Sequence, residues 1–187
     1  MTIKTSQDSD DSLFFCTFTC FNWIPLFEIT NFYSEIYKWF DILVERECKI
    51  IAYVIMPNHC HFIVFVPSKE NISKLVANGK RFMAYEIVKR LQNIGKLKLL
   101  KDLEESVDPN EKKIGKRHNV FQPSFDAKPI FSEKFLFQKL DYIHHNPVSG
   151  KWNLVEVYTE YEHSSAKYYE FGEFGIYPVT HYEDVFG

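Results

Sequence analysis

The sequence predicts an α+β fold, in which a small antiparallel sheet has helices packed on one face. Segments rich in aromatic and β-branched residues alternate with segments whose apolar residues recur at helical spacing. Two of the strand-like segments are joined only by Pro57-Asn58, a link typical of an antiparallel hairpin. The 187 residues suffice for one domain with a sizeable core, since 45% are hydrophobic and 17% aromatic.

The first half of the chain supplies three strands and one helix. Leu13–Phe21 (LFFCTFTCF) is rich in aromatic residues and threonine, which favours a strand. Apolar residues recur every three or four positions over Asn31–Glu47, which predicts a helix. Lys49–Met56 and His59–Val66 are the two strands of the hairpin.

The second half is expected to be mainly helical. Ile72–Leu91 is amphipathic, and Ser132–Asn146 begins with a good N-cap and stops before a proline, so both are predicted helices. Between them, residues 95–119 are polar and basic with Gly and Asp-Pro, and we predict a flexible loop. Val120–Ile130 contains two prolines and is predicted to be irregular or a short edge strand.

This order of elements resembles a ferredoxin-like or RRM-like domain. We expect one domain over residues 12–171, a disordered leader at 1–11 and a C-terminal tail at 172–187. No apolar stretch reaches the roughly 18 residues of a membrane span, and the polar, acidic start is unlike a signal peptide. The sequence therefore predicts a cytoplasmic protein with no membrane partner.

The cysteines and the charges exclude some classes and leave others open. The cysteines form no C-x-x-C pair, so we expect small buried hydrophobes: Cys16, Cys20, Cys48 and Cys60. A net charge of −3 argues mildly against a nucleic-acid partner. However, residues 74–117 hold 12 Lys and Arg against 6 Asp and Glu, enough to face phosphates. A solvated helix followed by a charged loop would give the same pattern.

Two histidines and a later helix suggest a metal site. His59 and His61 project from the same face of their strand, where two imidazoles suit a divalent metal. On the last helix, a Leu/Ile stripe should pack on the sheet. Tyr142 and Asn146, four residues apart, share a second face. Lys139 lies on the same side as a possible supporting charge, and His145 is adjacent to it.

Each of these features has a simpler interpretation. An H-x-H pair is more commonly two surface histidines on a half-buried strand. An Asn before a Pro commonly ends a helix, and a Tyr on a helix flank is usually half-buried packing. The combination is more specific, because it assembles a nucleophile and metal ligands from two elements that must touch.

The segments AYVIMPNHCHFIVFVP and QKLDYIHHNPVSGKW, the second followed by YEHSSAKYY, resemble a known family. They are similar to the HUH motif and the catalytic helix of single-tyrosine transposases, in the REP-associated tyrosine transposase branch. The resemblance implies a single-stranded DNA endonuclease and strand transferase that acts on hairpin-containing DNA. It implies that Mg²⁺ or Mn²⁺ is bound by His59, His61 and Asn146, and that Tyr142 forms a 5′-phosphotyrosine intermediate. Some relatives act as homodimers with the tyrosine helix supplied in trans, and others act as monomers.

Two other functions stay open at this point. One is a catalytically silent or domesticated nucleic-acid-binding module of the same fold. The other is a metallophosphoesterase that uses an activated water molecule. Only the transposase hypothesis needs a tyrosine nucleophile, because the covalent tyrosyl ester conserves the energy of the cut bond.

Overall fold

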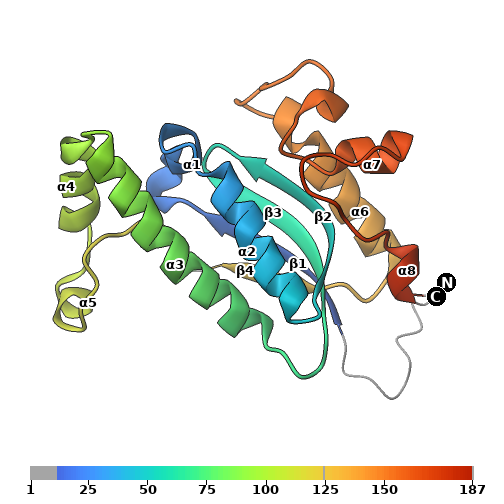
Figure 1. Cartoon of the computed structure of the whole chain (residues 1–187), viewed down its shortest axis with the longest axis horizontal. Coiled ribbons are helices and arrows are strands. Elements are labelled where there is room, and N and C mark those ends of the chain that lie inside the picture. The colour runs from blue at the N-terminus through green and yellow to red at the C-terminus, as the bar shows by residue number, and fades with distance from the viewer. Residues whose placement is uncertain (1–11, 124, 187) are drawn as a thin grey trace.

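The computed structural model describes residues 12–123 and 125–186. Four strands form one antiparallel sheet in the order β2-β3-β1-β4: β1 (Ser12–Thr19), β2 (Lys49–Met56), β3 (His59–Val66) and β4 (Asp126–Pro129). The helices are α1 (Leu26–Ile29), α2 (Tyr33–Glu45), α3 (Ile72–Asn93), α4 (Leu97–Glu105), α5 (Pro109–Lys113), α6 (Glu133–His145), α7 (Ala166–Phe171) and α8 (Glu183–Phe186). With α2 between β1 and β2, and α3 between β3 and β4, the predicted α+β, ferredoxin-like fold class is confirmed (Figure 1).

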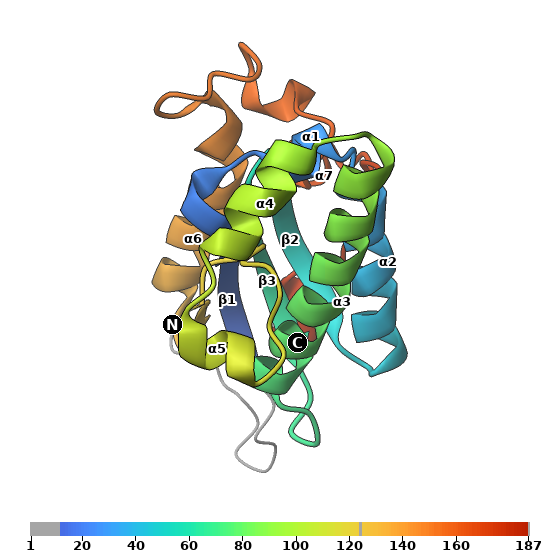
Figure 2. The same cartoon turned by 90° about the vertical axis from the view of Figure 1, so that its left-hand side faces the viewer.

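The two faces of the sheet carry different cores. Residues such as Phe18 and Phe62 face α2 and α3, in the larger core. Phe15 and Ile63 face the opposite way, and there α6 packs on the sheet. We expected helices on one face only, so this detail needs correction: α2 and α3 lie on one side and α6 on the other (Figure 2). The reason is that the strands are apolar on both faces, so each face needs a cover.

The alternation along β3 positions the two histidines. Cys60, Phe62 and Val64 are buried on the side of α2 and α3, and the two histidines at 59 and 61 turn toward α6. His59 and His61 therefore share one face of β3, as predicted, and Cys60 lies on the other. All four cysteines are free and buried, as expected.

The segment 95–119, predicted to be a flexible loop, instead contains α4 and α5. Leu100 and Leu103 are one turn apart and buried against the core, and this pair anchors α4 although its other residues are mostly charged. Asp108 caps α5 by accepting a hydrogen bond from the Asn110 backbone N–H. The density of charge on the exposed faces hid this short apolar stripe from the sequence interpretation.

Residues 172–186 also depart from the expected tail. Val179 is buried in the larger core, and the Thr180 backbone N–H donates a hydrogen bond to the Ile50 carbonyl on β2. The Tyr177 hydroxyl donates to Asp41 on α2. This segment is therefore part of the domain. The expected leader at 1–11 lies outside the described residues.

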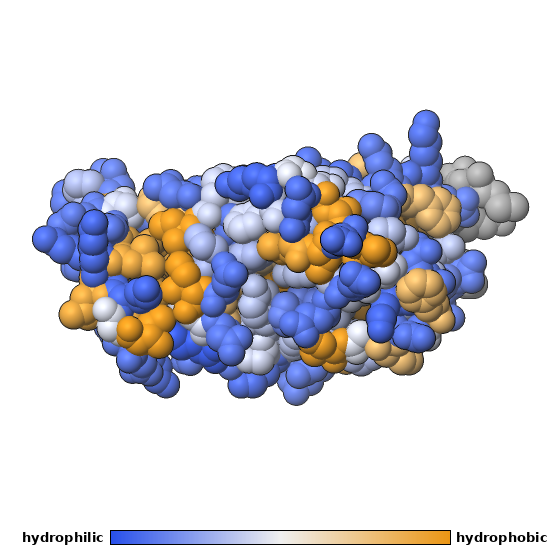
Figure 3. All heavy atoms as spheres, turned by 90° about the horizontal axis from the view of Figure 1, so that it is seen from above, coloured by the Kyte–Doolittle hydropathy of each residue, from blue (hydrophilic) through white to orange (hydrophobic). Residues whose placement is uncertain are grey.

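The upper end of the molecule in Figure 1 has a mixed surface. Hydrophilic residues cover most of it, and hydrophobic residues form separate smaller groups between them (Figure 3). Within the described ranges, no helix has both the length and the apolar character needed to span a bilayer.

Candidate active site

The histidines of β3 lie side by side in the layer between the sheet and α6. His59 and His61 are each only 5% exposed, and their ring centroids are 4.7 Å apart. Strand pairing sets Thr19 opposite His59 and Thr17 opposite His61 on β1. The Phe15 ring, on β1, stacks on the His61 ring with the two centroids 5.6 Å apart.

Both imidazoles are held through the same nitrogen, Nδ1. Thr17 Oγ1 lies 2.7 Å from Nδ1 of His61, and Asn58 Oδ1 lies 2.7 Å from Nδ1 of His59. The amide of Asn58 is itself oriented, because its Nδ2 donates to the Trp23 carbonyl at 2.7 Å. An amide oxygen can only accept, so His59 carries its proton on Nδ1 and leaves the Nε2 lone pair available. Metal-binding histidines are commonly held by this arrangement.

Helix α6 brings the other two groups to the histidines. Its first turn is capped by Ser132, as predicted, since the Phe135 backbone N–H donates to the serine hydroxyl. The predicted apolar stripe packs on the sheet through Leu136, Leu140 and Ile143. In consequence the Tyr142 hydroxyl lies 3.4 Å from Nε2 of His61, and Asn146 Oδ1 lies 3.1 Å from Nε2 of His59.

Burial keeps the histidines uncharged at neutral pH. Desolvation lowers the pKa of His59 to about 4, and the nearby Asn146 oxygen only partly opposes the shift. The pKa of His61 is lowered as well, first by burial and then by His59 and Lys139. Neutral imidazoles are the form that binds a metal ion.

The contact between His59 and Asn146 fits a cation. With the proton of His59 on Nδ1, the Nε2 lone pair faces the Asn146 oxygen lone pairs at 3.1 Å. Two neighbouring ligands of an octahedral ion at about 2.1 Å would lie about 3.0 Å apart. A divalent cation would satisfy both groups at once. Among the described residues no three His, Cys, Asp or Glu are grouped so that they could hold a metal ion, so the Asn146 amide would complete the ligand set.

Of the two supporting residues expected from the sequence, Lys139 and His145, only the first lies in the site. Lys139 Nζ lies 5.4 Å from the centre of the Tyr142 ring and 4.6 Å from that of Phe15, so it joins the site. His145 does not join it. It faces away, with Nδ1 3.1 Å from Asp141 Oδ1, and its ring contacts Tyr158.

We compared the chain with known protein families and solved structures. Residues 28–104 match the family model described as "Transposase IS200 like". The chain resembles the IS200-like transposases. The match includes the β2–β3 hairpin and α3, and it covers about two fifths of the 187 residues. It therefore includes both histidines, whereas the helix with Tyr142 and Asn146 lies outside it.

One solved structure supports the same fold. A REP-associated tyrosine transposase bound to a REP hairpin has 20% sequence identity and a TM-score of 0.54, covering 90% of this chain and 86% of the other. A candidate transposase from Deinococcus radiodurans has 17% identity and a TM-score of 0.44, covering 71% and 88%. No curated protein matches the sequence. The resemblance to tyrosine transposases indicated by the two motifs is confirmed.

In this IS200-like fold, three residues that the sequence interpretation missed hold the histidines in place. They are Thr17, Asn58 and Trp23. Asn58 directly precedes the first histidine, so its position offered a signal. Thr17 could be found only from the pairing of β1 with β3. Trp23 is 54% exposed and packs edge-on against His59 at 5.7 Å, from a turn (Phe21–Trp23) in which its own φ is positive.

We expect the protein to lose stability in mild acid, mainly through its buried histidines. Burial lowers the pKa of His144 to about 4, and its Nε2 lies 3.0 Å from the Ser165 hydroxyl. Between pH 6.5 and 4 the unfolded chain binds a proton that the folded protein excludes. The free energy of unfolding should therefore fall over this range, by about 3 kcal/mol from His144. Above pH 6.5 this contribution is complete, and below pH 4 it is lost.

Urea unfolding at several pH values between 7 and 4 measures this loss. His144→Gln keeps a polar partner for Ser165 and should make the dependence on pH shallower. Equal slopes for the variant and the wild type would show that His144 is not the source.

Proposed function

We propose that this chain is a metal-dependent single-stranded DNA endonuclease and strand transferase, a transposase that acts through a covalent 5′-phosphotyrosine intermediate on Tyr142. One observation carries the proposal. The Tyr142 hydroxyl, the two histidine Nε2 atoms and the Asn146 oxygen converge within a single chain, with contacts of 3.1 and 3.4 Å between the elements. A tyrosine used only for packing would not need to point its hydroxyl at a metal-binding pair.

His59, His61 and Asn146 are the residues that would hold Mg²⁺ or Mn²⁺. Such an ion, when bound, stabilises the negative charge that develops on the oxygens of the scissile phosphate. The Nδ1 partners of the histidines, Thr17 and Asn58, fix the ring orientations before any ligand arrives. Burial holds both rings neutral and therefore ready to bind.

Tyr142 is the proposed nucleophile. Its side chain is 46% exposed, so a phosphodiester can reach the hydroxyl from solvent. The phenol oxygen forms a bond to phosphorus, the bond to the 3′ oxygen of the preceding nucleotide breaks, and the phenol proton is balanced by the proton gained at that 3′ oxygen. Lys139, beside the ring, adds a positive charge where the phosphate would lie. The tyrosyl ester retains the energy of the original bond, so a second 3′ hydroxyl can reverse the step without ATP.

The proposed substrate is a single strand or the single-stranded part of a hairpin, since a duplex restricts access to the backbone. The similar transposase that was solved with a REP hairpin supports DNA of this kind. Contact between Tyr142 and His61 within one chain supports cleavage in cis, so a homodimer would not be needed to complete the site. We propose that the protein acts in the cytoplasm on such DNA.

Covalent trapping tests this function. The wild-type protein, incubated with 5′- or 3′-labelled hairpin-containing single strands and Mn²⁺, should give a protein–DNA adduct that survives denaturing electrophoresis, and EDTA should prevent its formation. Binding without any cut would favour a catalytically silent module. A cut strand without an adduct would favour hydrolysis by an activated water.

Thr17→Val should impair the site without disturbing the strand. Valine has nearly the same shape and the same preference for strands, but it removes the oxygen 2.7 Å from Nδ1 of His61. Loss of such a partner lowers metal affinity or activity by about 10- to 100-fold. Mn²⁺ titration and the adduct rate measure the effect. Thr19→Val, on the same face of β1, is the matched control, and equal effects of the two substitutions would contradict the positioning role.

A further inference from the structure

A hollow lies away from the histidines, between α3 and the segment that follows α5. Its volume is about 630 Å³, and its walls combine aromatic, aliphatic and basic side chains. One wall is a stripe along α3 with helical spacing: Arg81, Tyr85, Val88 and Gln92. The opposite wall is formed by residues 115–118 and by Val120.

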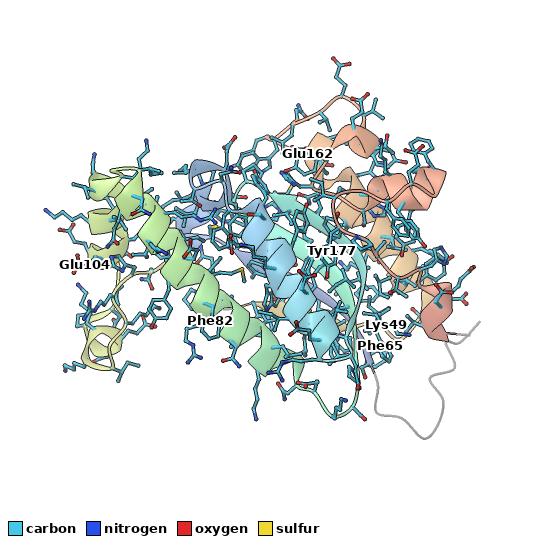
Figure 4. The ribbon with its side chains drawn as sticks, in the orientation of Figure 1. Lys49, Phe65, Phe82, Glu104, Glu162 and Tyr177 are labelled. Carbon is cyan, nitrogen blue, oxygen red and sulfur yellow. The ribbon has the colours of Figure 1, made fainter. Side chains whose placement is uncertain are left out.

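The aromatic component of this hollow is unusually accessible. Tyr85 is 71% exposed although it lies in the middle of a long helix, so its ring face is available for stacking. Phe82 on the same helix is 64% exposed but does not line the hollow, and it projects outward from α3 (Figure 4). A stacking surface for planar ligands is therefore present at Tyr85, and a comparable exposed ring lies outside it.

The charge of the hollow is positive. Its lining residues include Arg81, Lys116 and Arg117 and, among the described residues, no carboxylate. Lys116 is paired with Glu111 at 2.9 Å. Arg81 and Arg117 form no ion pair within the described ranges; the Arg81 guanidinium lies over the Phe82 ring, 5.2 Å from its centroid, and Arg117 is available to an anion.

A series of contacts links this hollow to the histidines of β3. Val120, in its wall, accepts a hydrogen bond at 2.9 Å from the Phe21 backbone N–H. Phe21 begins the turn that ends at Trp23, and the Trp23 ring contacts His59. The hollow and the histidines lie on opposite faces of the sheet, and this turn at the end of the sheet contacts both.

We propose that this hollow between α3 and residues 115–120 is a binding site for single-stranded DNA, in which a base stacks on Tyr85 and Arg117 binds a neighbouring phosphate. This inference deepens the proposed function and rests on it for the identity of the strand. The chemistry is that of sequence-tolerant single-strand binding, which combines base stacking with contacts to the backbone. It also gives a role to the basic middle of an otherwise acidic chain.

Equilibrium binding tests the site independently of cleavage. The fluorescence anisotropy of a short labelled oligodeoxythymidine is measured with the full-length protein in EDTA, over a range of salt concentrations. Tyr85→Ala should weaken binding by about 5- to 150-fold, the range for loss of one stacked base. Arg117→Gln should reduce the slope of log affinity against log salt by about 0.7, the value for one phosphate contact on a single strand.

The matched controls are Phe82→Ala and Lys74→Gln, which remove an exposed ring and an exposed charge from α3 outside the hollow. Unchanged binding by the controls, with weaker binding by the two test variants, supports the site. Wild-type affinity and slope in Tyr85→Ala and Arg117→Gln would overturn it, and so would tighter binding of duplex DNA or oligouridylate. Neither result depends on adduct formation, so failure of the proposed catalysis is seen separately.

Discussion

Tyr142→Phe is expected to abolish the covalent protein–DNA adduct and strand cleavage in the presence of Mn²⁺. The substitution removes one oxygen atom and leaves the ring that packs edge-on against Phe15 and His61. Since the hydroxyl is partly exposed and makes only a long contact with Nε2 of His61, the fold should not depend on it. Without the nucleophile we expect a loss of about 10⁴-fold or more in rate.

The Tyr142→Phe substitution should affect only the strand-cleavage step. DNA affinity and the thermal midpoint of Tyr142→Phe should match those of the wild type. Tyr158→Phe removes a hydroxyl from a tyrosine that contacts His145, outside the proposed site, and should form the adduct normally. An adduct that persists in Tyr142→Phe would show that another residue is the nucleophile.

His59→Ala is expected to have the next largest effect, with adduct formation reduced by about 10³-fold or more at any practical Mn²⁺ concentration. The substitution removes a nitrogen that faces Asn146 and leaves only His61 and the amide as protein ligands. Two ligands bind a divalent ion far less tightly than three, so the charge on the phosphate would be poorly stabilised. Mn²⁺ affinity and adduct yield should fall together.

Two further variants separate this effect from misfolding. His59→Gln keeps a polar side chain of similar size and should fold as the wild type does, yet bind Mn²⁺ weakly. His145→Ala removes a histidine that faces away from the site and should retain activity within a few-fold. Normal cleavage by both His59 variants would exclude His59 as a ligand.

The parts of the fold that the sequence predicts well are those with one dominant periodicity. Lys49–Met56 and His59–Val66 form strands with the predicted bounds, because each is a continuous apolar segment and only two residues join them. The stripe through Leu136 and Ile143 also predicts correctly which side of α6 meets the sheet. These signals are local, and local patterns can be read from one chain.

The features that the sequence could not supply depend on contacts between distant segments. Thr17 lies beside His61 only because β1 pairs with β3 in one register, and the short β1 pattern does not fix that register. Helix α4 depends on two leucines within a charged segment. The Tyr85 hollow needs α3 and residues 115–118 to face each other, although about thirty residues separate them.

The central claim is that a divalent cation and the Tyr142 hydroxyl meet over the β3 histidines. Anomalous diffraction from crystals of the protein soaked in Mn²⁺ tests it most directly. We predict a single strong peak within coordination distance of Nε2 of His59, Nε2 of His61 and Oδ1 of Asn146, on the side that Tyr142 faces. A structure with Mn²⁺ bound elsewhere, or with these three atoms free of metal at saturating Mn²⁺, would contradict the account.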